Sequence, residues 1–107
     1  MKQGFNAENH TDENENPAGG FVDGRGISIS WQSGPLQAAG GERLDPNGAF
    51  VEDVIAAAKQ RLEHYQESKF RCRENALAIT KLEEALHWLE ARAADREARG
   101  VEGTHSV

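Results

Sequence analysis

The chain has 107 residues, of which 37% are hydrophobic, and its 18 acidic and 12 basic residues give a formal net charge of −6. This length allows a single domain with a thin core, which favours self-association. The acidic balance argues against a general binder of double-stranded DNA or of a membrane surface, because both need a basic face. No apolar run is long enough to span a bilayer, and the first five residues lack the apolar core of a signal peptide.

The first part of the chain is polar. Residues 1–24 are dominated by Asn, Glu and Gly, with few large apolar side chains. Such a segment cannot bury enough apolar surface to offset the entropy lost on ordering. We therefore predict that residues 1–24 form a polar, disordered tail and that one folded domain spans residues 25–107.

A strand is predicted directly after this tail. Ile27, Ile29 and Trp31 alternate with polar residues, which is the period-two pattern of a half-buried strand. One strand is not stable by itself, so it needs a partner in the tail, in residues 36–44 or in another subunit. The strand region is expected to span 26–44.

Two helices are predicted in the second half of the chain. The first covers about 46–66, with Asp45 or Asn47 as its N-cap. The second covers about 70–99 and ends at Gly100. Its apolar residues recur in steps of four and three, as in a coiled-coil seam, so the two helices should form an antiparallel hairpin. The predicted fold is α+β: a short N-terminal antiparallel strand region followed by a long two-helix antiparallel hairpin, in an oligomer.

The residues that could carry chemistry favour binding over catalysis. The four histidines never stand at metal-ligand spacing, and no phosphate-binding loop, nucleophile elbow or zinc motif is present. Cys72 is the single cysteine, which excludes an internal disulfide and a cysteine-based zinc site. We interpret it as an ordinary small residue on the second helix, and we assign no catalytic residue, metal or cofactor.

Arginine is concentrated near both ends of the second helix. Arg71 and Arg73 stand at its start, and Arg92, Arg96 and Arg99 recur near its end at spacings of four and three. The latter three therefore share one face. They either pair with neighbouring acids on the surface, at about 0–1 kcal/mol each, or bind an anionic ligand.

Asn75 stands in the seam of the second helix, where an apolar residue is expected. A buried amide there either sets the register of the helices or reads a polar edge of a nucleotide. The aromatic side chains are open to two interpretations as well. They are core residues, or they are stacking platforms for a base beside Arg: Trp31, Tyr65, Phe70 and Trp88.

Several stretches, taken in order, resemble one known family. They are Trp31-Gln32-x-Gly34-Pro35-Leu36, Pro46-Asn47-Gly48-Ala49-Phe50-Val51-Glu52-Asp53-Val54-Ile55, Tyr65-Gln66, Phe70-x-Cys72-Arg73-Glu74-Asn75-Ala76-Leu77-Ala78-Ile79-Thr80-Lys81-Leu82, Ala85-Leu86-His87-Trp88-Leu89, Arg92, Arg96 and Arg99-Gly100-Val101-Glu102-Gly103-Thr104-His105. This set covers roughly residues 26–105. It resembles the phage anti-Thoeris sponge family, whose members carry a helical-hairpin domain shared with anti-CBASS sponges.

The resemblance implies a protein of the host bacterial cytoplasm that sequesters immune signalling nucleotides. The ligands would be glycocyclic ADP-ribose isomers, bound without degradation, and their removal would block Thoeris immunity. Some relatives also hold cyclic oligonucleotides at a separate interface, so the resemblance leaves open a second ligand class, cyclic di- or trinucleotides, with anti-CBASS activity. The resemblance further implies a homodimer or hexamer, with no DNA or membrane partner.

Site residues follow from the resemblance by position. It assigns Asn75 and Arg92 to ligand contact and Tyr65 to the aromatic pocket, with Arg96 completing a grip on phosphate. Weaker matches are Trp31, Phe70 and Arg73, and Arg43 corresponds to a second-ligand site. The alternative hypothesis is a structural or regulatory helical hairpin that binds protein partners.

Overall fold

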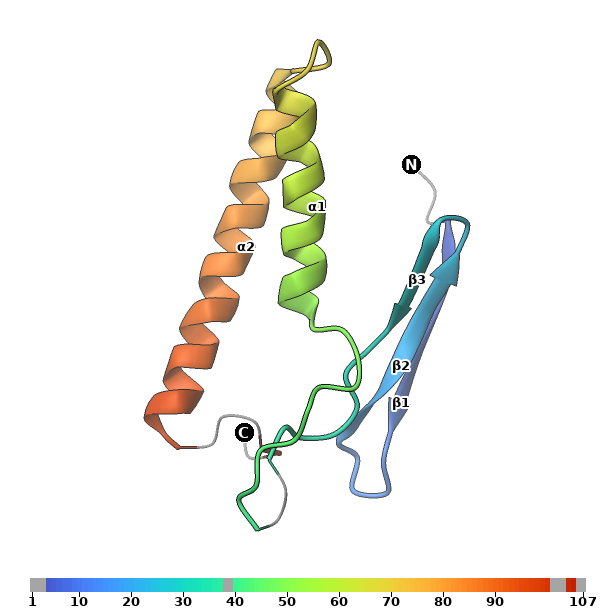
Figure 1. Cartoon of the computed structure of the whole chain (residues 1–107), viewed down its shortest axis with the longest axis vertical. Coiled ribbons are helices and arrows are strands. Elements are labelled where there is room, and N and C mark those ends of the chain that lie inside the picture. The colour runs from blue at the N-terminus through green and yellow to red at the C-terminus, as the bar shows by residue number, and fades with distance from the viewer. Residues whose placement is uncertain (1–3, 38–39, 101–103, 106–107) are drawn as a thin grey trace. The chain divides into compact units, whose positions relative to one another are not determined.

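The computed structural model describes residues 4–37, 40–100 and 104–105 (Figure 1). The elements in chain order are β1 (Phe5–Thr11), β2 (Pro17–Gly24), β3 (Ile27–Ser30), α1 (Val51–Gln66) and α2 (Arg73–Ala98). The chain divides into two compact units, one with the strands and the loop up to Phe50, the other with the two helices. The α+β fold class is confirmed, while the oligomer stays a prediction.

The three strands form one antiparallel sheet in the order β1-β2-β3. Val22 in the central strand pairs with Ala7 of β1 and with Ile29 of β3. Ile29 is half-buried and its neighbour Ser30 is exposed, which is the alternation that the sequence pattern predicts. Val22, at 8% exposure, is the buried apolar side chain among the described residues.

The prediction of a disordered tail over residues 1–24 is wrong for residues 4–24, because β1 and β2 are formed there, while residues 1–3 lie outside the described part of the chain. β2 is the central strand, and it pairs with β3, so the partner from residues 1–24 is confirmed. Backbone hydrogen bonds to two neighbours supply the stabilisation that the composition argument left out. The glycines suit this pairing: a Cβ on Gly20 would collide with the carbonyl oxygen of Glu8 across the ladder.

The turn between β1 and β2 is organised by one carboxylate. Asp12 Oδ1 accepts the backbone N–H groups of Asn16, at 3.0 Å, and of Asn14, at 2.8 Å. Chiefly the Asn16 bond lowers the pKa of Asp12 below its ordinary value. The stabilisation of this turn is therefore complete at neutral pH and is lost as pH falls through that lowered pKa. Asn16 Nδ2 also lies 3.3 Å from His105 Nδ1, which brings the end of the chain to this turn.

Amide side chains close the loop that leads from β3 to α1. Asn47 Oδ1 accepts the Ser33 N–H at 2.8 Å, and Asn47 Nδ2 donates to the Ser33 carbonyl at 2.9 Å. Gln32 Oε1 accepts the Asn47 N–H at 2.8 Å. Asn47 is therefore occupied in the loop, and the prediction that Asp45 or Asn47 caps the first helix is wrong. The helix begins at Val51 instead of about 46.

Gly48 stands where two backbone segments approach closely. Ala49 N–H donates to the Ser30 carbonyl at 2.7 Å, and Gln32 N–H donates to the Ala49 carbonyl at 2.9 Å. A Cβ on Gly48 would lie 2.6 Å from the carbonyl carbon and oxygen of Trp31. This approach leaves room for glycine alone.

The two helices form a hairpin with a thin core. α1 has 16 residues and α2 has 26, and none of their described side chains is fully buried. Leu62, Leu82 and Leu89 are half-buried members of the seam. Figure 1 shows that α2 continues beyond the start of α1. Because α2 is longer by ten residues, this extension amounts to about 15 Å at the helical rise per residue.

Gly48→Ala is expected to destabilise the sheet unit by about 1–3 kcal/mol, because its Cβ must displace backbone. The control is Gly40→Ala, since a Cβ there meets no described atom within 4 Å and φ is not in the left-handed region. That change should stay within about 0.5 kcal/mol of the wild-type value. Urea unfolding followed by tryptophan fluorescence measures both, and equal midpoints would contradict the close approach.

Candidate functional site

The turn between α1 and α2 positions the first group of candidate residues. Gln66, the last residue of α1, donates from Nε2 to the Cys72 carbonyl and accepts the Cys72 N–H at Oε1, both at 3.0 Å. Ser68 Oγ donates to the Tyr65 carbonyl at 2.6 Å and accepts the Phe70 N–H at 3.1 Å. These bonds fix the chain reversal that sets Tyr65, Phe70 and Asn75 near one end of the hairpin.

Tyr65 lies in the last turn of α1 with 37% of its surface exposed. Its hydroxyl accepts a hydrogen bond from Arg61 Nε at 3.2 Å. The guanidinium carbon of Arg61 lies 5.0 Å from the ring centroid. The phenol ring is therefore held by a cation one helical turn earlier, and part of it faces solvent.

Phe70 is the most exposed large apolar side chain of the described hairpin, at 68%. Lys69 Nζ lies 5.3 Å from its ring centroid. Arg71 and Arg73 are exposed beside it. This short turn therefore combines an exposed ring with three cations in a chain whose formal net charge is −6.

Asn75 belongs to the first turn of α2, which begins at Arg73 and not at residue 70. Cys72 is the N-cap, and its Sγ accepts the Asn75 backbone N–H at 3.4 Å. The interpretation of Cys72 as an ordinary helical residue is therefore corrected to a cap. The Asn75 side chain is half-buried and makes no hydrogen bond with any described residue. Its amide is left with donor and acceptor capacity, although its role is still a prediction.

The second group lies near the other end of α2. Arg92 is exposed and makes no hydrogen bond or ion pair with a described residue. Arg96 is half-buried and has interactions of its own, and Arg99 Nε pairs with Asp95 at 3.0 Å. The hypothesis of surface ion pairs therefore holds for Arg99, whereas the Arg92 guanidinium keeps its donors available.

The two groups are far apart within one chain. Asn75 and Arg92 stand on the same continuous helix. At the helical rise per residue, their backbones are about 25 Å apart along the axis. A single copy of the hairpin therefore does not bring Asn75 and Arg92 around one small ligand.

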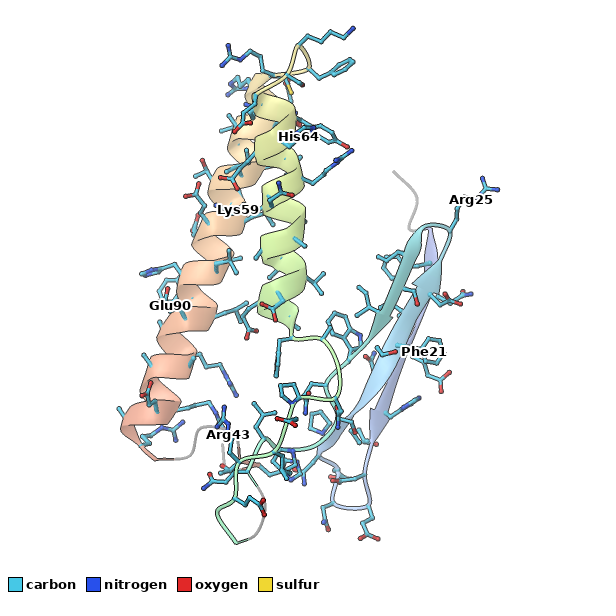
Figure 2. All side chains as sticks on the ribbon, viewed as in Figure 1. Phe21, Arg25, Arg43, Lys59, His64 and Glu90 are labelled. Atoms are coloured by element: carbon cyan, nitrogen blue, oxygen red, sulfur yellow. The ribbon has the colours of Figure 1, made fainter. Side chains whose placement is uncertain are left out.

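Trp31 and Arg43 belong to the other unit of the chain. Trp31 is half-buried and forms a bridge with Ala49, so it is part of the closed loop. Arg43 is exposed and forms a bridge with Gln37 across the loop (Figure 2). Both residues therefore lie in or beside the loop that leads from β3 to α1.

The described residues contain no group of three or more His, Cys, Asp or Glu side chains that could hold a metal ion. No helix in the described part of the chain has the length and apolar character needed to cross a membrane. The candidate residues themselves offer forked cations, exposed rings and one amide, which are groups that can bind a planar anionic ligand.

The chain is thus a small α+β protein that carries these groups at both ends of a helical hairpin. The comparisons then place it: the family described as "Acb2/Tad1, hairpin domain" matches residues 25–94, and the chain belongs to that family. It is also 52% identical, over 82 residues, to the protein named "Thoeris anti-defense 1" of Bacillus phage SBSphiJ7. This match covers 77% of the chain and 54% of the relative, so the chain spans about half the length of that protein. The resemblance to the anti-Thoeris sponge family is thereby confirmed.

Two residues near the candidate site were missed from the sequence. No role is predicted for Arg61 from the sequence, although its spacing of four residues from Tyr65 indicates that the two side chains meet. Nothing in the sequence predicts the contact that Gln66 makes, apart from its position at the end of the first helix. Its contact with Cys72 depends on the conformation of the turn, which the sequence pattern does not specify.

Gln66→Ala is expected to destabilise the hairpin by about 1–2 kcal/mol, because it removes both bonds to the Cys72 backbone. Gln60→Ala is the control, since Gln60 is exposed on the same helix and Ala favours helix. Thermal unfolding followed by helical circular dichroism compares the two. A Gln66→Ala melting temperature equal to that of the control would mean that the turn holds without its amide.

Proposed function

We propose that this chain is an anti-Thoeris sponge that binds cyclic ADP-ribose-type signalling nucleotides in the host cytoplasm without degrading them. The name of the relative supports Thoeris as the immune system that this chain counters, and the 52% identity supports a shared role. The observation that carries the ligand chemistry is Arg92, an exposed guanidinium with no partner among the described residues on an acidic chain. A free planar cation suits a phosphate group.

The ligand would lie between two copies of the chain. Asn75 and Arg92 are about 25 Å apart along α2, which is too far for one small nucleotide to contact both in a single copy. If two α2 helices pack antiparallel, the Asn75 end of one copy comes beside the Arg92 end of the other. The two groups of candidate residues then meet in one pocket.

Each group has a distinct task in this pocket. Arg92 and Arg96 would donate charge-assisted hydrogen bonds to the two phosphates of the ligand. Tyr65 would stack on the adenine, helped by the exposed ring of Phe70, and Asn75 would read polar edges of base or ribose. Arg73 is the first residue of α2, two residues before Asn75, and adds positive charge at this end of the hairpin.

The proposal includes release of the ligand unchanged. Heating the saturated protein and analysing the released nucleotide by mass spectrometry separates a sponge from a hydrolase, because only the sponge returns the intact isomer. Titration with cyclic di- and trinucleotides in the same series tests the second ligand class. An Arg43→Ala variant that loses these ligands alone would assign them to Arg43.

Arg92→Ala is expected to weaken binding of cyclic ADP-ribose isomers by roughly tenfold to two-hundredfold, through loss of about 1.5–3 kcal/mol of charge-assisted contact. Isothermal titration calorimetry with a panel of isomers measures the change. Arg25→Ala is the matched control, because Arg25 is exposed and projects from the turn between β2 and β3 (Figure 2). Wild-type affinity in Arg92→Ala would refute the assignment, and loss of helical circular dichroism would make Arg92 structural.

Trp88→Glu is expected to convert the assembly to monomers. Trp88 is 67% exposed and Leu77 is 47% exposed, and their spacing places both on one face of α2. An exposed face of this kind is covered in a self-associating chain. Light scattering should report a dimer or larger assembly for the wild type. The Ala94→Glu control should give the same size, because Ala94 points about 120° away from Trp88 around the helix axis. A wild-type monomer would contradict the shared pocket and favour the hairpin as a module for protein partners.

A further inference from the structure

Arg61 and Tyr65 form a side-chain pair, and the resemblance to the family assigns a role to Tyr65 but not to Arg61. Tyr65 presents its ring at the end of α1, and Arg61 lies one turn earlier on the same face. The Nε–H of Arg61 donates to the Tyr65 hydroxyl at 3.2 Å, and the guanidinium carbon lies 5.0 Å from the ring centroid. The two contacts together restrict the Tyr65 side chain, because a change of its χ1 rotamer would break both.

The guanidinium is only partly used in this contact. It carries five N–H donors, of which the hydrogen bond to Tyr65 takes the one at Nε. The four donors on the two terminal nitrogens bond to no described residue. An exposed ring and an available fork of donors are thus held within one helical turn of each other.

A ring beside a guanidinium matches one class of ligand, a planar base joined to phosphate. The ring provides a face for the base, and the fork provides two parallel donors for a phosphate oxygen pair. The neighbouring Lys69 and Arg73 add positive charge at the same end of the hairpin, so an anion is favoured there.

We propose that Arg61 is a specificity-determining residue of the nucleotide site: it orients the Tyr65 ring for stacking and donates from its terminal nitrogens to a phosphate of the ligand. This inference rests on the proposed function and adds a fourth arginine, from α1, to Arg73, Arg92 and Arg96 of α2. It differs from Arg92 in that Arg61 acts on base and phosphate together, since one side chain holds both the ring and the anion.

The test is a double-mutant cycle of Arg61→Gln and Tyr65→Phe, measured by calorimetry with the cyclic ADP-ribose isomer that the wild type binds most tightly. Arg61→Gln should weaken binding about tenfold or more, and Tyr65→Phe should weaken it less, because the ring stays while the bond to Nε is lost. In the Arg61→Gln background, Tyr65→Phe should have no further effect, since the two residues act as a pair.

A second readout separates a phosphate contact from a structural role. Arg61→Gln should lower the dependence of the dissociation constant on salt concentration, and Arg61→Lys should restore that dependence without restoring full affinity. Arg25→Gln makes the same charge change at a distant turn and should leave both readouts at the wild-type value. Circular dichroism confirms that each variant keeps its helices.

The outcomes are distinct. If the wild type binds the nucleotide and the affinity of Arg61→Gln is within twofold of the wild-type affinity, this inference is overturned and the proposed function stays in place. Additive effects of the two substitutions, with an unchanged salt dependence, overturn it too. If the wild type binds no cyclic ADP-ribose isomer, the proposed function fails and this inference fails with it.

Discussion

The hairpin depends on the reciprocal hydrogen bonds between the Gln66 side chain and the backbone of Cys72. No described side chain in either helix is fully buried, so apolar packing alone gives this unit little stability. A helical hairpin with a shallow seam can slide or splay unless its turn is fixed. The amide fixes the turn by satisfying a donor and an acceptor of one residue at the same time. This contact holds Cys72, the N-cap of α2, and Asn75 stands three residues further along the same helix.

The same device appears in the other unit, where Asn47 satisfies the N–H and carbonyl of Ser33. This explains one limit of prediction from the sequence. Asn before a helix is a good N-cap, and Asn in a loop closure is equally good, because both use its short amide. The choice depends on whether the Ser33 backbone is within reach, which is decided by the path of the loop. Similarly, the sequence predicted β3 from local alternation but missed β1 and β2, whose stability comes from pairing across the sheet.

Some features of the candidate site likewise follow from local helical spacing, whereas others depend on residues that are distant along the chain or belong to another copy. Helical spacing alone places Arg92 and Arg96 on one face, and it also brings Arg61 to Tyr65, although that pair was overlooked. The resemblance assigns Asn75 and Arg92 to one ligand, but it does not say how far apart the two residues lie in space. The helix predicted over about 70–99 contains both residues, and the continuous α2 confirms that they are about 25 Å apart in one copy. The assignment can hold only if residues of two copies meet, which no pattern in a single sequence specifies.

A pocket shared by two copies would give the thin core a function. If the ligand bridges residues of two chains, every bound nucleotide favours the assembled form, and the apparent stability of the assembly rises with ligand concentration. The reverse coupling has the same magnitude, so association of the chains tightens the hold on the ligand. Release would then require the interface to open, which slows dissociation without any new contact to the nucleotide. A sponge needs slow release and no turnover. A weakly packed hairpin that is completed by its partner and its ligand meets that need better than a rigid monomer with a preformed cavity.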